Sequence, residues 1–146
     1  MAAPATKFRL ARLGPSDWLL LAEALAALAL ASLAIALLPF RKVAAAASAP
    51  GRGPPRHDAE TVRRVRGVVQ GWARRVPWRA VCFQRGLALH WMLRRRGIPS
   101  VLLYGARRQG DGLSAHVWVD VDGETVIGGE EAANFTCLAR FPPDAG

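Results

Sequence analysis

The sequence predicts an α+β domain that follows an N-terminal helix rich in alanine and leucine. Three observations support this prediction: a long apolar run over residues 18–38, a helical pattern that begins at Cys82, and two strand-like runs after that helix. Two cysteines, Cys82 and Cys137, make a poor case for a disulfide framework and could pair only if the fold brought them close; no cluster of cysteine and histidine has metal-ligand spacing. We therefore expect neither a metal nor a cofactor.

The apolar segment 18–38 is the first predicted helix. Ser16 or Asp17 caps its start, Pro39 ends it, and its length is sufficient to cross a bilayer. Three interpretations stay open: a membrane-spanning helix, a signal peptide, and a helix that packs on the domain or lies in the membrane interface. Glu23 is unfavourable in hydrocarbon, and the run is long for a signal peptide, so each of the first two has a cost.

The composition divides the chain into three parts. Residues 1–43 hold a basic tail, expected to be poorly ordered up to residue 15, and the apolar helix; residues 44–57 are interpreted as a linker too irregular to pack. Residues 58–146 form the predicted main domain. Its first helix is expected from Thr61 to Trp72, where valines share one face.

Cys82 is the first candidate functional residue. Pro77 ends the preceding segment, and apolar residues recur at helical spacing from Cys82 until Gly97 provides a C-cap. Unpaired N–H groups in a first helical turn stabilise a thiolate, and Arg79 and Arg85 would act in the same direction. The pattern is that of a cysteine nucleophile, although a small buried apolar cysteine would give the same spacing.

His116 is the candidate base. A strand is predicted over residues 100–105, then a basic turn over residues 107–112, then a strand over residues 115–121, in which valines face the core and His116 faces the other way. A helix-start cysteine followed by a strand histidine is the order found in thiol enzymes. Trp78 and Trp118 either wall a substrate groove or pack on the helix. Of the other histidines, His57 is expected in solvent, and His90 in packing or on the surface.

The net charge indicates an acidic partner. Twenty Lys and Arg stand against 11 Asp and Glu, which gives +9. Such a surface attracts nucleic acid, anionic lipid or an acidic peptide segment. Because no nucleic-acid-binding motif accompanies the charge, we do not expect nucleic acid to be the partner.

The region from Trp78 to about Phe141 resembles the transglutaminase-like leader peptidases of lasso-peptide biosynthesis. The likeness rests on the order and spacing of Cys82, the helix end at residues 93–97 and the run Ala115-His116-Val117-Trp118-Val119-Asp120-Val121-Asp122-Gly123, and it reaches back to residues 37–42. It implies a papain-like cysteine protease core, a helix bearing the cysteine packed on a small antiparallel sheet bearing the histidine. It further implies that the protein removes the leader from a ribosomally synthesised precursor during maturation.

The resemblance also implies partners and a location. A separate small protein would recognise the leader, and an ATP-using cyclase would close the ring. Proteins of this family carry a comparable Leu-rich segment before the catalytic part. The expected location is therefore the cytoplasm, with membrane association through residues 18–38 and a membrane surface as a further partner.

The chain departs from the family pattern at the acid that follows the histidine. Asp122-Gly123 predicts a type I′ hairpin turn, and counting outward from it pairs His116 with Gly129. Glu130 is the first substitute, since a one-residue shift or bulge would turn it inward. Glu131, a backbone carbonyl and a water stay open as alternatives.

These residues predict a mechanism. Cys82 attacks a peptide carbonyl, His116 takes and returns the proton, and the backbone N–H of Cys82 helps to stabilise the oxyanion. A non-catalytic peptide-binding or scaffold protein of the same pathway is one alternative. A membrane-anchored thiol acyltransferase is the other, because hydrolysis and acyl transfer share their first step.

Overall fold

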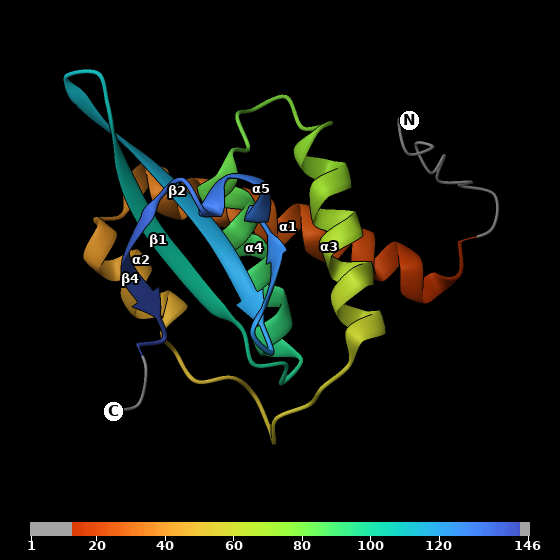
Figure 1. Ribbon diagram of the computed structural model, residues 1–146. Coiled ribbons are helices and arrows are strands. Elements are labelled where there is room, and N and C mark those ends of the chain that lie inside the picture. Colours follow the sequence, from red (N-terminus) through yellow and green to blue (C-terminus); the bar gives the residue numbers. More distant parts are fainter. Residues whose placement is uncertain (1–12, 144–146) are drawn as a thin grey trace, which may run out of the picture.

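The longer helices lie on one face of a four-stranded sheet in the computed structural model, which describes residues 13–143 (Figure 1). The elements are α1 (Pro15–Leu37), α2 (Phe40–Ala47), α3 (Ala59–Ala73), α4 (Cys82–Arg95), β1 (Val101–Gln109), β2 (Gly112–Val121), β3 (Glu124–Ile127), α5 (Gly129–Ala132) and β4 (Thr136–Phe141). The predicted α+β class is confirmed. The expectation for the tail falls mostly on residues 1–12, which lie outside the described residues.

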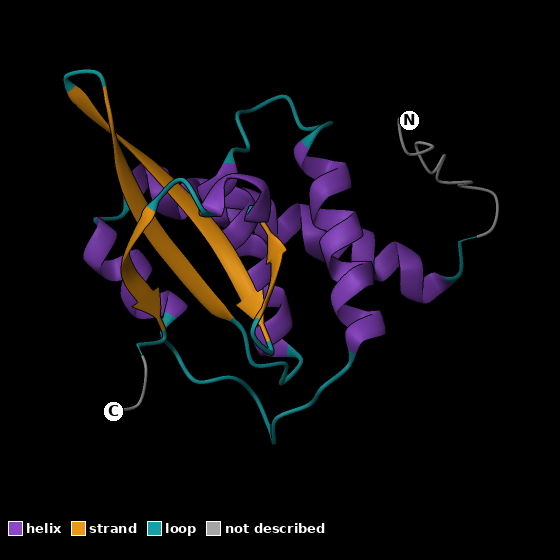
Figure 2. Cartoon of the chain, viewed as in Figure 1, coloured by secondary structure: helices purple, strands orange, loops and turns teal. Residues whose placement is uncertain are grey.

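The sheet has the order β3-β2-β1-β4, with every pair antiparallel (Figure 2). β1 and β2 form a long hairpin whose tip projects beyond the rest of the sheet (Figure 1). The predicted basic turn over residues 107–112 is wrong: β1 continues to Gln109 and β2 starts at Gly112, so only two residues turn. Arg107 and Arg108 therefore lie on a strand.

α4 is the central helix of the fold, packed between the sheet and the pair α1 and α3. Its middle is buried nearly all round, which includes Leu87, Ala88, Leu89, Met92 and Leu93. Gly86 allows the helix to approach the sheet closely, because a methyl group there would lie 2.9 Å from a methyl of Val117. Val117 and Val119 thus face the core, as the alternation in β2 predicts.

The hairpin between β2 and β3 is confirmed in its turn and wrong in its register. Asp122 and Gly123 both have positive φ, and Val121 pairs with Glu124, as a type I′ turn requires. The register then shifts, because Val119 pairs with Ile127. β3 ends at Ile127, so Gly129 does not face His116 and the predicted pair does not form.

α1 shares its core with the rest of the chain. A buried stripe runs along it, made of Leu20, Ala24, Leu28 and Ala31. Polar contacts tie it to α3, to α4 and to the loop between them: the pairs are Asp17 with Arg64, the carbonyl of Leu21 with Trp72, Glu23 with Arg96, and Ser32 with Trp78. The packed arrangement is the third of the interpretations left open by the sequence.

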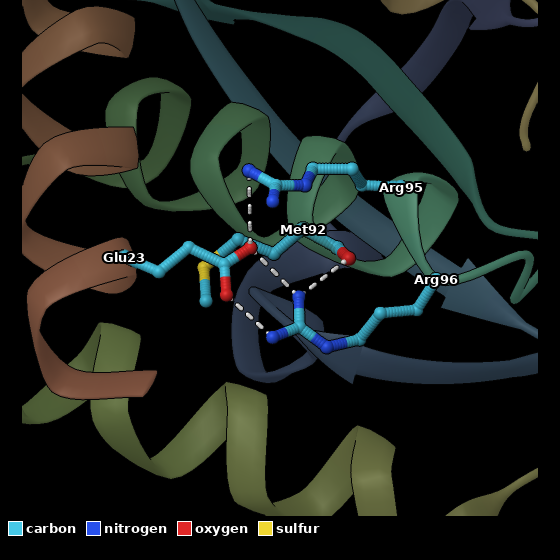
Figure 3. Close-up of polar contacts among 4 residues, drawn as sticks. All are labelled: Glu23, Met92, Arg95 and Arg96. Carbon is cyan, nitrogen blue, oxygen red and sulfur yellow. Dashed lines mark hydrogen bonds and ion pairs between the residues drawn. The ribbon is translucent and has the colours of Figure 1, made fainter. Parts of the chain in front are cut away.

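Glu23 makes the most extensive of these contacts (Figure 3). Its carboxylate accepts two hydrogen bonds from the guanidinium of Arg96, one of them at 2.8 Å, and lies 3.8 Å from Arg95. The hydrogen bond from Arg96 is the largest cause that lowers the pKa of Glu23 below its ordinary value. The charge that seemed costly in a membrane helix is therefore paired within the fold.

α1 is also the one helix in residues 13–143 that is long and apolar enough to cross a membrane. Only 22% of its most apolar stretch is buried within the structure. The face turned away from the domain carries exposed leucines, Leu19, Leu30, Leu33 and Leu37 among them. Length and apolar composition alone do not distinguish a membrane-spanning helix from a helix that packs on a domain.

The expected linker is shorter than predicted. Residues 44–47 form the end of α2, where Val43 and Ala47 are buried. Ala47 also contacts α4, because its carbonyl oxygen lies 2.6 Å from Nε2 of His90. The core thus continues across the predicted boundary, and irregular chain begins only after residue 48.

Candidate active site

A cleft of about 400 Å³ lies at the N-terminal end of α4, beside β2 and α5. Cys82 and His116 both line it. The other lining residues are Gln70, Arg85, Arg107, Ser114, Ala115, Val117, Ile127, Gly128, Glu130, Glu131 and Phe135. The fold thus brings together two residues that are far apart in the sequence.

Cys82 is the first residue of α4 and is half-buried. Val81 before it is extended, so the helix begins at the cysteine itself, as the spacing predicts. The N–H groups of a first helical turn have no acceptor within the helix. The thiol therefore stands among backbone donors that favour negative charge.

The imidazole of His116 is held by a backbone carbonyl. Its Nε2 lies 2.8 Å from the oxygen of Gly128. A carbonyl only accepts, so Nε2 carries the proton, and Nδ1 of the neutral ring is then an acceptor. The acceptor of the ring proton is therefore the backbone, one of the alternatives left open, in place of Glu130.

Gly128 is suited to this position by its backbone. Its φ is +78°, in the left-handed region that glycine adopts at little cost. A methyl group there would lie 2.7 Å from the carbonyl oxygen of Val117. Only glycine fits closely enough against β2 to direct its carbonyl at the histidine.

Aromatic rings fix the plane of the imidazole. Trp118 stacks on His116 with ring centroids 5.9 Å apart, and Phe135 stacks on it at 5.0 Å. The guanidinium of Arg107 lies 4.8 Å from the centroid of Phe135. His116 is consequently buried and oriented from several sides.

The predicted substrate walls are placed differently. Trp118 is buried against the histidine and is not among the residues that line the cleft. Trp78 lies in the loop before α4, where its Nε1 donates to Ser32 on α1 at 3.0 Å. Among the described residues, the side chain of Phe, Tyr or Trp that lines the cleft is Phe135, which lies just before β4.

Charged side chains of both signs line the cleft. Glu130 and Glu131 lie on α5, and within residues 13–143 neither makes a hydrogen bond or ion pair with His116. Of the two arginines expected near Cys82, Arg85 lines the cleft and Arg79 does not. Gln70 and Arg107 were not anticipated. An alternation count through β1 could have identified Arg107, since it pairs with Ser114 beside the histidine.

The two remaining histidines lie away from the cleft. His57 is exposed to solvent, as expected, and its Nδ1 lies 2.9 Å from a carboxylate oxygen of Asp122. His90 is fully buried between Ala47 and Ser100, and burial lowers its pKa to about 4. His90 is a packing residue, in agreement with its place two turns beyond the cysteine. In the described part of the chain no group of His, Cys, Asp or Glu could hold a metal ion.

The fold and the cleft define an α+β domain in which a helix-start cysteine and a strand histidine line the same cleft. A family model described as the transglutaminase-like superfamily matches residues 24–140, from the middle of α1 to β4. The chain therefore belongs to the transglutaminase-like superfamily. No curated protein and no solved structure matches it.

Proposed function

We propose that this protein is a cysteine peptidase that removes the leader from a ribosomally synthesised lasso-peptide precursor. The observation that supports it most is the shared cleft, in which Cys82 opens α4 and His116 is held through Nε2. Membership of a superfamily that includes cysteine proteases supports the class of reaction. The leader as substrate rests on the resemblance carried by the residues around Cys82 and His116.

In the proposed reaction the thiol of Cys82 passes its proton to Nδ1 of His116 while the sulfur attacks the scissile carbonyl. The oxyanion is stabilised by the free N–H groups at the start of α4. The imidazolium then returns the proton to the leaving amine, and an acyl-enzyme remains. Water attacks this thioester with His116 as base, which releases the carboxylate product and restores the thiol.

The carbonyl of Gly128 takes the role of the missing acid in this proposal. The acid of a triad chiefly fixes the tautomer and orientation of the histidine, and an acceptor at Nε2 does both. Glu130, the acid predicted from the sequence, does not bond His116 but lines the same cleft, so a separate catalytic role for it is a prediction to test. Comparison of Glu130→Gln with Glu131→Gln tests it, since a catalytic role predicts a loss of kcat for the first variant only.

Leader recognition is proposed to need partners. A small leader-binding protein would present the precursor, and a lasso cyclase would use the released core. The net charge of +9 suits an acidic leader or an anionic surface. Contact with a membrane surface is proposed through the outer face of α1, with the catalytic domain in the cytoplasm.

The experiment is mass spectrometry of a candidate precursor from the neighbouring genes, incubated with this protein and any small partner encoded there. We expect one cut between leader and core, which is lost in Cys82→Ala and in His116→Ala. Cys137→Ala is the matched control, because Cys137 is a free, exposed cysteine that is not among the residues of the cleft. Cleavage that persists in Cys82→Ala would remove the mechanism.

The same experiment separates the alternatives. Binding of the precursor without any cut favours the scaffold protein. A product that carries an added amine, when an amine is supplied, identifies acyl transfer, because the thioester is then attacked by nitrogen instead of water.

A further inference from the structure

One edge of β2 is unpaired beside the cleft. β3 pairs with β2 only at residues 119–121, whereas β2 starts at Gly112. The projecting part of β2 therefore has β1 on one side and no strand on the other (Figure 1). An unpaired edge presents a row of free N–H and C=O groups.

The hairpin register tells which backbone groups face this edge. Gln109 and Gly112 flank a two-residue turn, so they form a hydrogen-bonded pair, and such pairs alternate along the ladder. Leu113, Ala115 and Val117 consequently direct their N–H and C=O groups away from β1. The segment at Gly128 packs against the carbonyl of Val117, which leaves the groups of Leu113 and Ala115.

Leu113 and Ala115 are open to a ligand. Both are exposed, Leu113 to 77%. Within residues 13–143, no loop, turn or helix end makes a backbone hydrogen bond with Leu113 or Ala115. Ala115 also lines the cleft next to His116, so the free edge leads directly to the catalytic pair.

We propose that the peptide substrate binds as an additional β-strand along the Leu113–Ala115 edge of β2, and this rests on the proposed function. Strand addition supplies affinity through main-chain bonds, and it selects an extended segment with little demand on its side chains. An unfolded stretch at a leader–core junction has this form. Alternate residues of the substrate pair with the edge, so proline at a paired position prevents binding.

Hydrogen exchange of Cys82→Ala with a synthetic peptide that spans the leader–core junction tests the binding mode without catalysis. We expect slower exchange of the amides of Leu113 and Ala115. In the described sheet β4 pairs with β1 alone, so its outer edge also has no neighbouring strand. This second edge serves as the internal control. Protection of β4, or of neither edge while the peptide binds, would contradict the proposal.

Ala115→Pro removes the outward N–H without removing a bond to β1. Ala115→Val adds bulk but keeps the N–H, and so measures the steric part. We expect the proline variant to bind the peptide about 10-fold more weakly than the valine variant, since one or two hydrogen bonds are lost. A separate check uses protein that keeps Cys82. The rate at which iodoacetamide alkylates Cys82 should be the same with and without Ala115→Pro, which shows that the proline leaves Cys82 and His116 in place.

The outcomes distinguish this proposal from the proposed function. Edge protection with no cut by wild-type protein supports strand addition and removes the peptidase. Cleavage by wild-type protein with equal binding by the proline and valine variants keeps the peptidase and refutes strand addition.

Discussion

Nε2 of His116 lies 2.8 Å from the carbonyl oxygen of Gly128, in a chain that has glycine where an acid is expected to follow the histidine. Gly128→Ala places a methyl group 2.7 Å from the Val117 carbonyl and strains a φ of +78°. We expect the Gly128 carbonyl to turn away from His116, and kcat for leader cleavage to fall by up to about 10²- to 10⁴-fold, the usual contribution of a positioned general base.

Gly123→Ala is the matched control for Gly128→Ala. Gly123 also has positive φ, at +82°, but has no atom within contact of an added methyl group. It should lose about 1 kcal/mol of stability from backbone strain and keep its kcat. Equal kcat in both variants would show that the carbonyl of Gly128 does not orient the base.

Cys82 should react with iodoacetamide faster than Cys137 at neutral pH, although Cys82 is the less exposed thiol. Cys82 begins α4 and lines the cleft with His116, as the proposed nucleophile would, whereas Cys137 lies on a strand outside the cleft. Peptide mapping of the alkylated protein over time gives both rates in one sample. His116→Ala should slow Cys82 alone, and a slower Cys82 in wild-type protein would argue against an activated nucleophile.

His90 should make stability depend on pH. Burial lowers its pKa from 6.5 to about 4, so the folded protein keeps the ring neutral while the unfolded chain takes up a proton. The contribution is full above about pH 6.5 and falls as the pH drops toward 4. Between about pH 7 and pH 5 the expected loss is roughly 2 kcal/mol.

Urea unfolding of wild-type protein and His90→Gln at both pH values measures this contribution. Because glutamine does not titrate, the variant should lose less stability over the same interval. Parallel pH dependence in the two proteins would show that His90 does not carry the effect.

Glu23 should anchor α1 through Arg96. Glu23→Gln leaves the half-buried guanidinium without its charge partner, and we expect a loss of about 1–2 kcal/mol in unfolding free energy at neutral pH. Because the pKa of Glu23 is lowered, this contribution is present above pH 4.5 and is lost as the pH falls below it.

Glu60→Gln is the control for Glu23→Gln. Glu60 pairs with Arg63 on the exposed face of α3, where an ion pair contributes at most about 0.5 kcal/mol. Chemical denaturation of the three proteins gives the comparison. If both variants lose the same small amount, the contact drawn in Figure 3 does not anchor the helix.

The outer face of α1 should bind anionic vesicles. Leu30 and Leu33 are exposed on this face, and a basic protein with an exposed apolar stripe is attracted to phosphatidylglycerol more than to phosphatidylcholine. Leu30→Glu combined with Leu33→Glu should abolish cosedimentation with phosphatidylglycerol vesicles. Leu138→Glu is the control, since Leu138 is 63% exposed on β4. Loss of binding in the control alone would place the contact on the sheet.

Local patterns in the sequence were sufficient for the elements that carry the candidate site. A proline before Cys82 and a glycine after the helix predict where α4 begins and ends, because caps and breakers act on neighbouring residues. Asp122-Gly123 predicts the type I′ turn for the same reason, since both residues tolerate positive φ. The candidate nucleophile and base could thus be predicted from spacing alone.

Contacts between distant segments could not be predicted in this way. One bulge between β2 and β3 shifts their register by one residue. Gly129 therefore does not face His116, and the carbonyl of Gly128 contacts the imidazole. Phe135 and Arg107 join the cleft only because β1 and the segment before β4 lie beside β2.

The N-terminal helix shows the same division. Its sequence determined a long apolar helix, since composition and the flanking proline act locally. Whether that helix packs on the domain or leaves it was decided by Arg96, Arg64 and Trp72, which come from later segments. Hydrogen bonds and ion pairs of this kind depend on distances in the folded chain, and those distances are set by the whole fold.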